Sequence, residues 1–182
     1  MNYVELSKEI SYVLRHNPQQ YGLELDEQGW VNVDVLIASL REQGRFKSLS
    51  INDLEKMIQV SEKKRHEIYD GKIRALYGHL VKEKIVKEPT KPPDVLYHGT
   101  ARRFTQSIFD VGLVSKNRQY VHLLEDINTA ETVGKRRDEK PTVLKINAKQ
   151  AWDDGVLFYW GSDNIWLADD IPAKHISLPY KS

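Results

Sequence analysis

The stretch Val95–Phe104 reads Val-Leu-Tyr-His-Gly-Thr-Ala-Arg-Arg-Phe and begins with residues that favour β-strands. We expect His98 to end this strand, Gly99 to allow a tight backbone turn and Thr100 to cap the helix that follows. Such a junction offers backbone N–H groups and an imidazole to a ligand that carries ribose hydroxyls and phosphates. The alternative is an ordinary strand–turn–helix junction whose histidine bonds a loop carbonyl.

The composition bounds the class of protein. The 182 residues suit one domain or two small lobes, and 40% of them are hydrophobic, which is enough for a packed core. No apolar run approaches the ~20 residues that a membrane helix needs, so we expect no membrane partner. The chain has no cysteine, which excludes disulfides and thiol nucleophiles and fits a cytoplasmic location.

The charge balance argues against one class of partner. Lys and Arg total 27 against 26 acidic residues, a formal net charge of +1. Non-specific binding to duplex DNA draws most of its affinity from phosphate neutralisation, so a protein this balanced is a poor candidate for it. A local anion site is compatible with this balance, because a few arginines can converge without changing the net charge.

The N-terminal segment has apolar residues at helical spacing, namely Leu6, Ile10, Val13 and Leu14. The predicted amphipathic helix ends at Asn17-Pro18, because a proline disfavours helical geometry in the residue before it. Arg15 and His16 then lie in the last turn, where the helix dipole favours cations. That dipole alone accounts for the pair, so their presence does not by itself indicate a site.

The next segments complete a first lobe. Leu23–Leu25 and Trp30–Val33 predict a small hairpin, Asp34 is expected to cap a helix, and Ser50 with Asp53 predicts a modified capping box on another. A second hairpin is expected around Asp70-Gly71, the strongest short-range hairpin signal in the chain. Three helices and a terminal hairpin predict a winged-helix-like lobe over residues 1–88.

A plain DNA-binding regulator is therefore a rival interpretation. Against it, the predicted helices of this lobe offer only Arg41 and Lys56 as bases over Val35–Gln43 and Asn52–Gln59. A helix that reads the major groove normally presents more arginine, lysine, asparagine or glutamine to base edges.

The charged, proline-rich segment Val81–Asp94 is expected to connect two lobes. Residues 89–182 then alternate short strands and short helices. Because these helices interrupt the strands rather than cover them, we expect an α+β fold with a split β-sheet in this lobe. The further predicted strands are Tyr120–Leu123, Thr142–Ile146, Val156–Tyr159, Ile165–Leu167 and Ile176–Leu178.

Several motifs resemble, in order and spacing, those of the NAD-dependent RNA 2′-phosphotransferase family, whose members are tRNA 2′-phosphotransferase-like and belong to the ADP-ribosyltransferase superfamily. Each motif alone is weak, but the ordered set is specific and spans essentially the whole chain. The motifs are Leu14-Arg15-His16-Asn17-Pro18, Gly29-Trp30, Lys63-Lys64-Arg65, Tyr97-His98-Gly99-Thr100, and Arg118 with Val121-His122-Leu123.

The resemblance implies a winged-helix-like RNA-binding lobe and an ADP-ribosyltransferase-type lobe that holds NAD. It matches the family's NAD-binding positions to His98, Gly99, Thr100 and His122. It matches the family's catalytic Arg-His-Arg-Arg set to Arg15, His16, Arg65 and Arg118. One departure is Leu124, where the family often has a small hydroxyl residue, which puts one peripheral contact in doubt.

The implied reaction transfers an internal 2′-phosphate from RNA to NAD, which is consumed. The phosphate attacks C1″ of the nicotinamide riboside and expels nicotinamide. O2″ then attacks the phosphorus, which releases 2′-hydroxyl RNA and ADP-ribose 1″,2″-cyclic phosphate. Guanidinium groups suit both steps because they bind phosphate bidentately, and a protonated imidazole can supply the proton to the departing RNA oxygen. No metal is expected, and we expect a monomer.

Other interpretations stay open at this stage. An ADP-ribosyltransferase that acts on protein or on nucleic-acid ends would leave ADP-ribose on its acceptor, and a winged-helix regulator would bind duplex DNA without consuming NAD. The basic run Lys135-Arg136-Arg137 is interpreted as a solvated helix end, with RNA-backbone contact as the less favoured option. His66, His79 and His175 are given structural roles, since no metal-ligand spacing links them.

Overall fold

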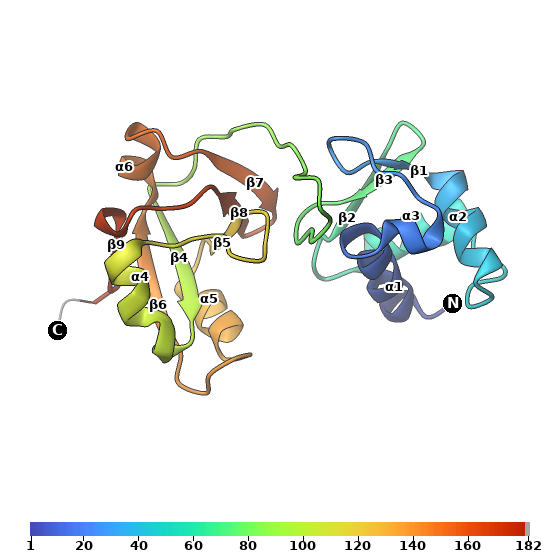
Figure 1. The fold of residues 1–182 in the computed structure, drawn as a ribbon. Coiled ribbons are helices and arrows are strands. Elements are labelled where there is room, and N and C mark those ends of the chain that lie inside the picture. The colour runs from blue at the N-terminus through green and yellow to red at the C-terminus, as the bar shows by residue number, and fades with distance from the viewer. Residues whose placement is uncertain (181–182) are drawn as a thin grey trace. The chain divides into compact units, whose positions relative to one another are not determined.

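The computed structural model describes residues 1–180 of the chain (Figure 1). The chain forms two compact units, Met1–Lys87 and a second unit that begins at Glu88. Each combines helices with an antiparallel sheet, which confirms the α+β class. Among the described residues, no helix has both the length and the apolar character needed to span a membrane.

The first unit has four helices, and the first of them buries the face that the sequence predicts. They are α1 (Tyr3–Arg15), η1 (Pro18–Tyr21), α2 (Val33–Glu42) and α3 (Ile51–Val60). The four apolar residues predicted for the inner face of α1 are fully buried. The side chains of Ser50 and Asp53 close a reciprocal capping box at the start of α3, as predicted. Local capping therefore decides where α3 begins, and periodicity decides which side of α1 faces the core.

The sheet of the first unit has three strands in the order β1 (Val31–Asn32), β3 (Lys72–Ala75) and β2 (His66–Tyr69). Asp70 and Gly71 connect β2 to β3 with positive φ angles of 47° and 70°, so the predicted second hairpin is confirmed. The predicted first hairpin is wrong. Leu23–Leu25 forms no strand, and β1 pairs with β3 instead.

The start of α2 also differs from its prediction. The side chain of Asn32 accepts hydrogen bonds from the backbone N–H groups of Asp34 and Val35, which makes Asn32 the N-cap. Asp34 lies two residues after Asn32, inside the first turn of the helix. Both residues are good caps, and only pairing of Asn32 with Lys72 decides where the strand gives way to the helix.

The segment predicted as a connection between lobes belongs in part to the first unit. Ile85 is only 3% exposed, and the N–H of Val86 donates to the carbonyl of Glu27. Ile85 packs near Gly29, which has a φ of +83°. A single apolar residue shows no periodicity along the sequence, so hydrophobic periodicity could not predict that Ile85 is buried.

The second unit is built on one six-stranded antiparallel sheet (Figure 1). Its order is β7 (Phe158–Ser162), β8 (Ile165–Ala168), β5 (Val121–Leu124), β4 (Val95–Thr100), β6 (Thr142–Asn147) and β9 (Ile176–Ser177). Each predicted strand of this unit is present to within two residues at its start. The order of the strands, which the sequence did not predict, places β4 and β5 side by side in the middle of the sheet.

Short helices connect these strands: η2 (Arg102–Phe104), α4 (Thr105–Val111), α5 (Ile127–Gly134), α6 (Ala148–Asp153) and η3 (Ala173–His175). Asp126 caps α5 by accepting the N–H of Thr129 at 2.7 Å, and Gly112 ends α4. Helix α5 packs on β4, β5 and β6. It therefore covers the centre of the sheet rather than only linking two strands.

The expected turn at residues 98–100 is not present. Strand β4 continues through Gly99 and Thr100, which pair with Val143 and Thr142 of β6, and Thr100 caps no helix. A Cβ atom on Gly99 would lie 1.9 Å from the carbonyl oxygen of Ala130 in α5. Gly99 is therefore needed for the close approach of α5 to β4, not for a turn.

Candidate functional site

Arg15 is the last residue of α1, and the protein packs around both its backbone and its side chain. Its carbonyl accepts the N–H of Leu80 at 2.8 Å. Its guanidinium carbon lies 4.7 Å from the centre of the Tyr77 ring, and its side chain passes beside Gly78, which has a φ of +82°. A guanidinium held over an aromatic face keeps its charge and a fixed position for an anionic ligand.

His16 follows Arg15 and caps α1, with its backbone N–H donating to the carbonyl of Tyr12. The two rings, His16 and Tyr12, lie 5.9 Å apart. Partial burial and the charge of Arg15 lower the pKa of His16 from its usual range. A phosphate dianion bound beside it would raise the pKa again, since an opposite charge favours the protonated imidazole.

Arg65 lies at the start of β2, and its carbonyl accepts the N–H of Leu76 at 2.9 Å. The next residue, His66, is 2% exposed, and its Nε2 lies 3.0 Å from the hydroxyl of Ser11 on α1. Burial lowers the pKa of His66 to about 3, and the charges of Arg15 and Arg65 act in the same direction. Both arginines therefore lie close to one neutral histidine, so the first unit brings two of the predicted catalytic residues together.

In the second unit, β4 and β5 pair only at Tyr97 and Leu124. Beyond this pair the ladder between the two strands stops, and side chains bridge them. The Nδ1–H of His98 donates to the carbonyl of His122 at 2.9 Å. The Nη1 of Arg118 donates to Nδ1 of the His122 ring, also at 2.9 Å. His98, His122 and Arg118 thus form a connected chain at the point where the strands separate.

The hydrogen bonds of this chain determine how the two histidine rings are protonated. Since Nδ1 of His98 donates to a carbonyl, the other nitrogen of a neutral His98 is an acceptor. Burial is the main influence on the pKa of His98 and lowers it; the His122 carbonyl opposes the shift and the charge of Arg118 reinforces it. The ring nitrogen of His122 that faces Arg118 is an acceptor, so a neutral His122 carries its proton on Nε2.

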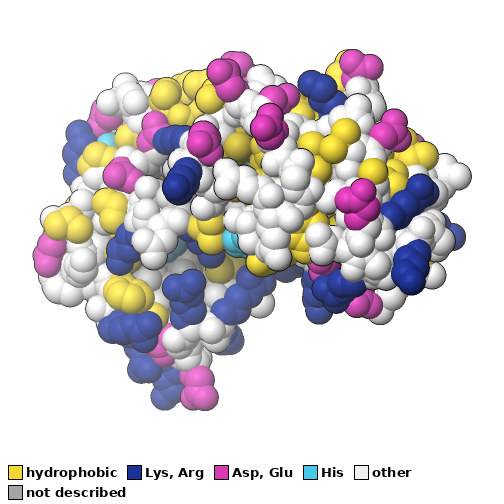
Figure 2. Space-filling model, turned by 45° about the vertical axis from the view of Figure 1, so that its right-hand side comes forward, with side chains coloured by type: hydrophobic (Ala, Val, Ile, Leu, Met, Phe, Trp, Pro, Cys, Tyr) yellow, Lys and Arg dark blue, Asp and Glu magenta, His cyan; other side chains and the backbone are white. Residues whose placement is uncertain are grey.

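Two further arginines, Arg136 and Arg137, lie near Arg118. The sequence predicts a solvated helix end for both of them. Surrounding protein atoms and the charges of Arg137 and Arg136 lower the pKa of Arg118. Figure 2 shows Lys and Arg side chains grouped at the tip of this unit, where the segment after α5 lies. The sequence does not predict that Arg136 and Arg137 lie near Arg118, because α5 brings residue 136 toward residue 118 only in the folded unit.

Comparison with known sequences decides the family. A sequence profile described as "RNA 2′-phosphotransferase, Tpt1 / KptA family" matches residues 1–170. The chain belongs to this RNA 2′-phosphotransferase family. A probable RNA 2′-phosphotransferase of Acetivibrio thermocellus is 56% identical over 176 residues, which cover 97% of each chain. One of Bacillus thuringiensis is 53% identical over 176 residues, 97% of this chain and 95% of the relative.

The similarity extends to an archaeal member of the RNA 2′-phosphotransferase family. The probable RNA 2′-phosphotransferase 1 of Archaeoglobus fulgidus is 39% identical over 172 residues, 94% of this chain and 79% of the relative. The resemblance found from the ordered motifs is thus confirmed. The family description implies an RNA substrate and a transferase activity.

In this RNA 2′-phosphotransferase family member, the eight predicted site residues fall into two groups. Arg15, His16 and Arg65 lie in the first unit, and the remaining five lie in the second. Hydrogen bonds connect Arg118, His122 and His98 in the second group, and in the first group the charges of Arg15 and Arg65 both act on His66. That the two groups act on one substrate stays a prediction. Within residues 1–180, no cluster of three or more His, Asp or Glu side chains is arranged to hold a metal ion.

Proposed function

We propose that the protein is an NAD-consuming RNA 2′-phosphotransferase that acts on RNA with an internal 2′-phosphate. The observation that carries the proposal is the family match over residues 1–170, in which all eight predicted site residues lie. The charges of Arg15 and Arg65, which both act on His66, and the hydrogen-bonded chain from Arg118 to His98 support it, since guanidinium groups bind anions well.

The second unit fits NAD as the co-substrate. Where β4 and β5 separate, backbone groups after Tyr97 are no longer paired between these two strands, so they can serve a ligand. The imidazole of His98, oriented by the His122 carbonyl, adds one acceptor on its free nitrogen. We propose that His98, Thr100 and His122 contact NAD in an ADP-ribosyltransferase-type split sheet, while Gly99 lets α5 approach behind them.

The first unit fits the RNA. Its helices and β2–β3 hairpin are arranged in the order expected of a winged-helix-like lobe. In the proposed first step, Arg15 and Arg65 orient the RNA 2′-phosphate toward C1″ of the nicotinamide riboside. The phosphate loses negative charge as the new bond to carbon forms and nicotinamide departs, so the arginines contribute mainly by positioning.

In the proposed second step, O2″ attacks the phosphorus of the ADP-ribosylated RNA and the RNA 2′-oxygen leaves. Charge then develops on the non-bridging phosphate oxygens, and guanidinium donors stabilise it more strongly than in the ground state. His16 is the candidate proton donor to the leaving oxygen. The nearby phosphate counteracts the burial and the Arg15 charge that lower the pKa of His16 in the ligand-free protein.

The test is to incubate the protein with NAD and a short RNA that carries an internal 2′-phosphate, with EDTA present. We expect nicotinamide, 2′-hydroxyl RNA and ADP-ribose 1″,2″-cyclic phosphate in equal amounts, and no requirement for a divalent metal. ADP-ribose left on the protein or on RNA ends would favour the alternative ADP-ribosyltransferase activity. Duplex DNA binding without NAD consumption would favour a regulator.

A further inference from the structure

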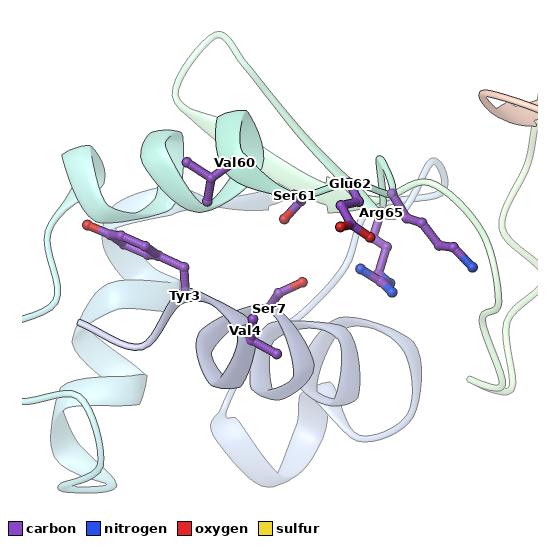
Figure 3. Close-up of a pocket in the computed structure, with 8 residues that line it drawn as sticks. Tyr3, Val4, Ser7, Val60, Ser61, Glu62 and Arg65 are labelled. Atoms are coloured by element: carbon purple, nitrogen blue, oxygen red, sulfur yellow. The ribbon is translucent and has the colours of Figure 1, made fainter.

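A cavity of about 370 Å³ opens in the first unit between the first turns of α1 and the end of α3 (Figure 3). This is near the lower end of the range for ligand pockets, which suits one small flat group rather than a helix or a peptide. The lining residues that matter here are Val4 and Ser7 on α1, Val60 and Ser61 at the end of α3, and Lys63 and Arg65 in the segment that leads into β2.

The walls combine apolar and polar groups. Val4 and Val60 are 67% and 55% exposed, so each presents a bare apolar surface at the rim. Ser7 is 5% exposed, and its hydroxyl, which points into the space below the Ser61–Arg65 segment, makes no hydrogen bond within the described residues 1–180 (Figure 3). Ser61 donates its hydroxyl to the Met57 carbonyl at 2.6 Å and keeps lone pairs for an incoming donor.

The cavity lies beside the arginines of the proposed RNA site. Ser7, Ser11 and Arg15 recur every four residues on α1 and share one side of the helix. Ser11 lies against His66, directly after Arg65, and Arg15 ends the same stripe. Ser7 is thus about 12 Å along the helix from Arg15, while Arg65 itself lines the cavity.

We propose that this cavity binds the base and ribose of an RNA nucleotide that flanks the two nucleotides of the 2′-phosphorylated junction. The inference rests on the proposed function and adds a subsite to it. A nucleoside has apolar faces to lie against Val4 and Val60 and hydroxyl groups to pair with Ser7 and Ser61. The phosphates on either side of this nucleoside can be bound by Lys63 and Arg65 at the rim, which belong to a run of three basic residues.

The experiment compares Val60→Glu with Val35→Glu, which makes the same change on α2 at a valine that is 49% exposed and outside the cavity. Both positions are on the surface, so both variants should fold. The substrates are a 2′-phosphorylated dinucleotide and an RNA with several nucleotides on each side of the junction. Steady-state KM is measured for each RNA and for NAD.

Val60→Glu should raise KM for the longer RNA about tenfold more than KM for the dinucleotide, because it replaces an apolar contact by a carboxylate that repels the RNA phosphates. Val35→Glu should leave both values as in the unmodified protein. Equal shifts for the two RNAs, or no shift for either, would overturn the proposal. A raised KM for NAD alone would instead assign the cavity to a nucleoside of NAD and would also overturn it.

Binding of the longer RNA is measured in parallel by fluorescence anisotropy without NAD. This separates the two hypotheses: absence of 2′-phosphate transfer by the unmodified protein would count against the proposed function, while the anisotropy comparison would still test the cavity. Weaker RNA binding by Val60→Glu than by Val35→Glu is the expected result. Equal binding by both variants would remove the subsite.

Discussion

The two units hold their predicted site residues in different ways. In the first, Arg15 is held by packing on Tyr77 and beside Gly78, and His66 is almost completely buried. In the second, side-chain hydrogen bonds connect Arg118 to His122 and His98 to the His122 backbone. Stacking on an aromatic ring positions a guanidinium group through that ring, whereas in a hydrogen-bond chain each side chain is positioned by its neighbour.

This difference suggests a division of work. The arginines of the first unit carry guanidinium groups, which bind phosphate bidentately and suit stabilisation of developing charge. The residues of the second unit orient one another at the opening between β4 and β5, which suits positioning of a co-substrate. Substitutions in the two units test this difference.

The largest effect is expected from Arg65→Ala and Arg15→Ala. Each should slow the second chemical step by about 10²-fold to 10³-fold, roughly 3–4 kcal/mol. Each should slow the first step, nicotinamide release, by a smaller factor. RNA that still carries ADP-ribose should accumulate as a slower band on a denaturing gel. Arg118→Ala, in the second unit, should slow nicotinamide release at least as strongly as the second step. These rates are measured in single-turnover reactions.

Arg65→Lys is the control for geometry, because it retains the charge but loses the bidentate fork and should rescue only in part. His16→Ala should resemble Arg65→Ala if His16 protonates the departing oxygen. Equal slowing of both steps by all of these variants, without trapped intermediate, would contradict a division of work between the units.

Gly99→Ala should destabilise the second unit by about 3 kcal/mol, because the new Cβ would lie 1.9 Å from the Ala130 carbonyl oxygen and helix α5 would have to move. Gly71→Ala in the first unit is the matched control. Nothing lies within 4 Å of its Cβ position, and only its φ of +70° opposes the change, at a cost of about 1 kcal/mol. Thermal unfolding and amide hydrogen exchange measure both. A smaller effect at Gly99 than at Gly71 would show that α5 is not held closely on β4.

Acid should destabilise the first unit more steeply than the second. Burial lowers the pKa of both His66 and His79 to about 3, against about 6.5 in the unfolded chain, so the unfolded state binds more protons between these values. The free energy of unfolding should therefore fall as the pH falls below about 6.5, by up to about 1.4 kcal/mol per pH unit for each histidine. In the second unit, burial lowers the pKa of His98 in the same direction.

Hydrogen exchange measured from pH 6.5 to 5.5 separates the two units, and it stays above most of the range in which carboxylates titrate. His66→Gln keeps a hydrogen-bonding partner for Ser11 and should reduce the pH dependence of the first unit by about half. An unchanged pH dependence in this variant would mean that His66 is not buried as a neutral ring.

The smallest effect is expected at the helix caps, where the units should behave alike. Ser50→Ala removes one half of the capping box on α3, and Asp126→Ala removes the single cap of α5. Each should cost about 1 kcal/mol of unfolding free energy, measured by chemical denaturation. A cost near zero at Ser50, with the expected cost at Asp126, would show that Asp53 alone satisfies the start of α3.

The sequence by itself determined the features that depend on near neighbours. The buried face of α1, the capping box of α3 and the Asp70-Gly71 hairpin follow from spacing and side-chain chemistry over a few residues, and the structure confirms each. The ordered motifs also identified the family, because a set of weak signals in a fixed order is specific even where no single one is.

Only the tertiary structure decided the features that depend on distant partners. β1 pairs with β3 rather than with its neighbour, Ile85 packs near Gly29, and Gly99 serves the contact with α5 rather than a turn. The grouping of Arg136 and Arg137 with Arg118 belongs to the same class. The physical reason is common to all: burial and charge act through space, so which residues meet depends on how whole elements pack.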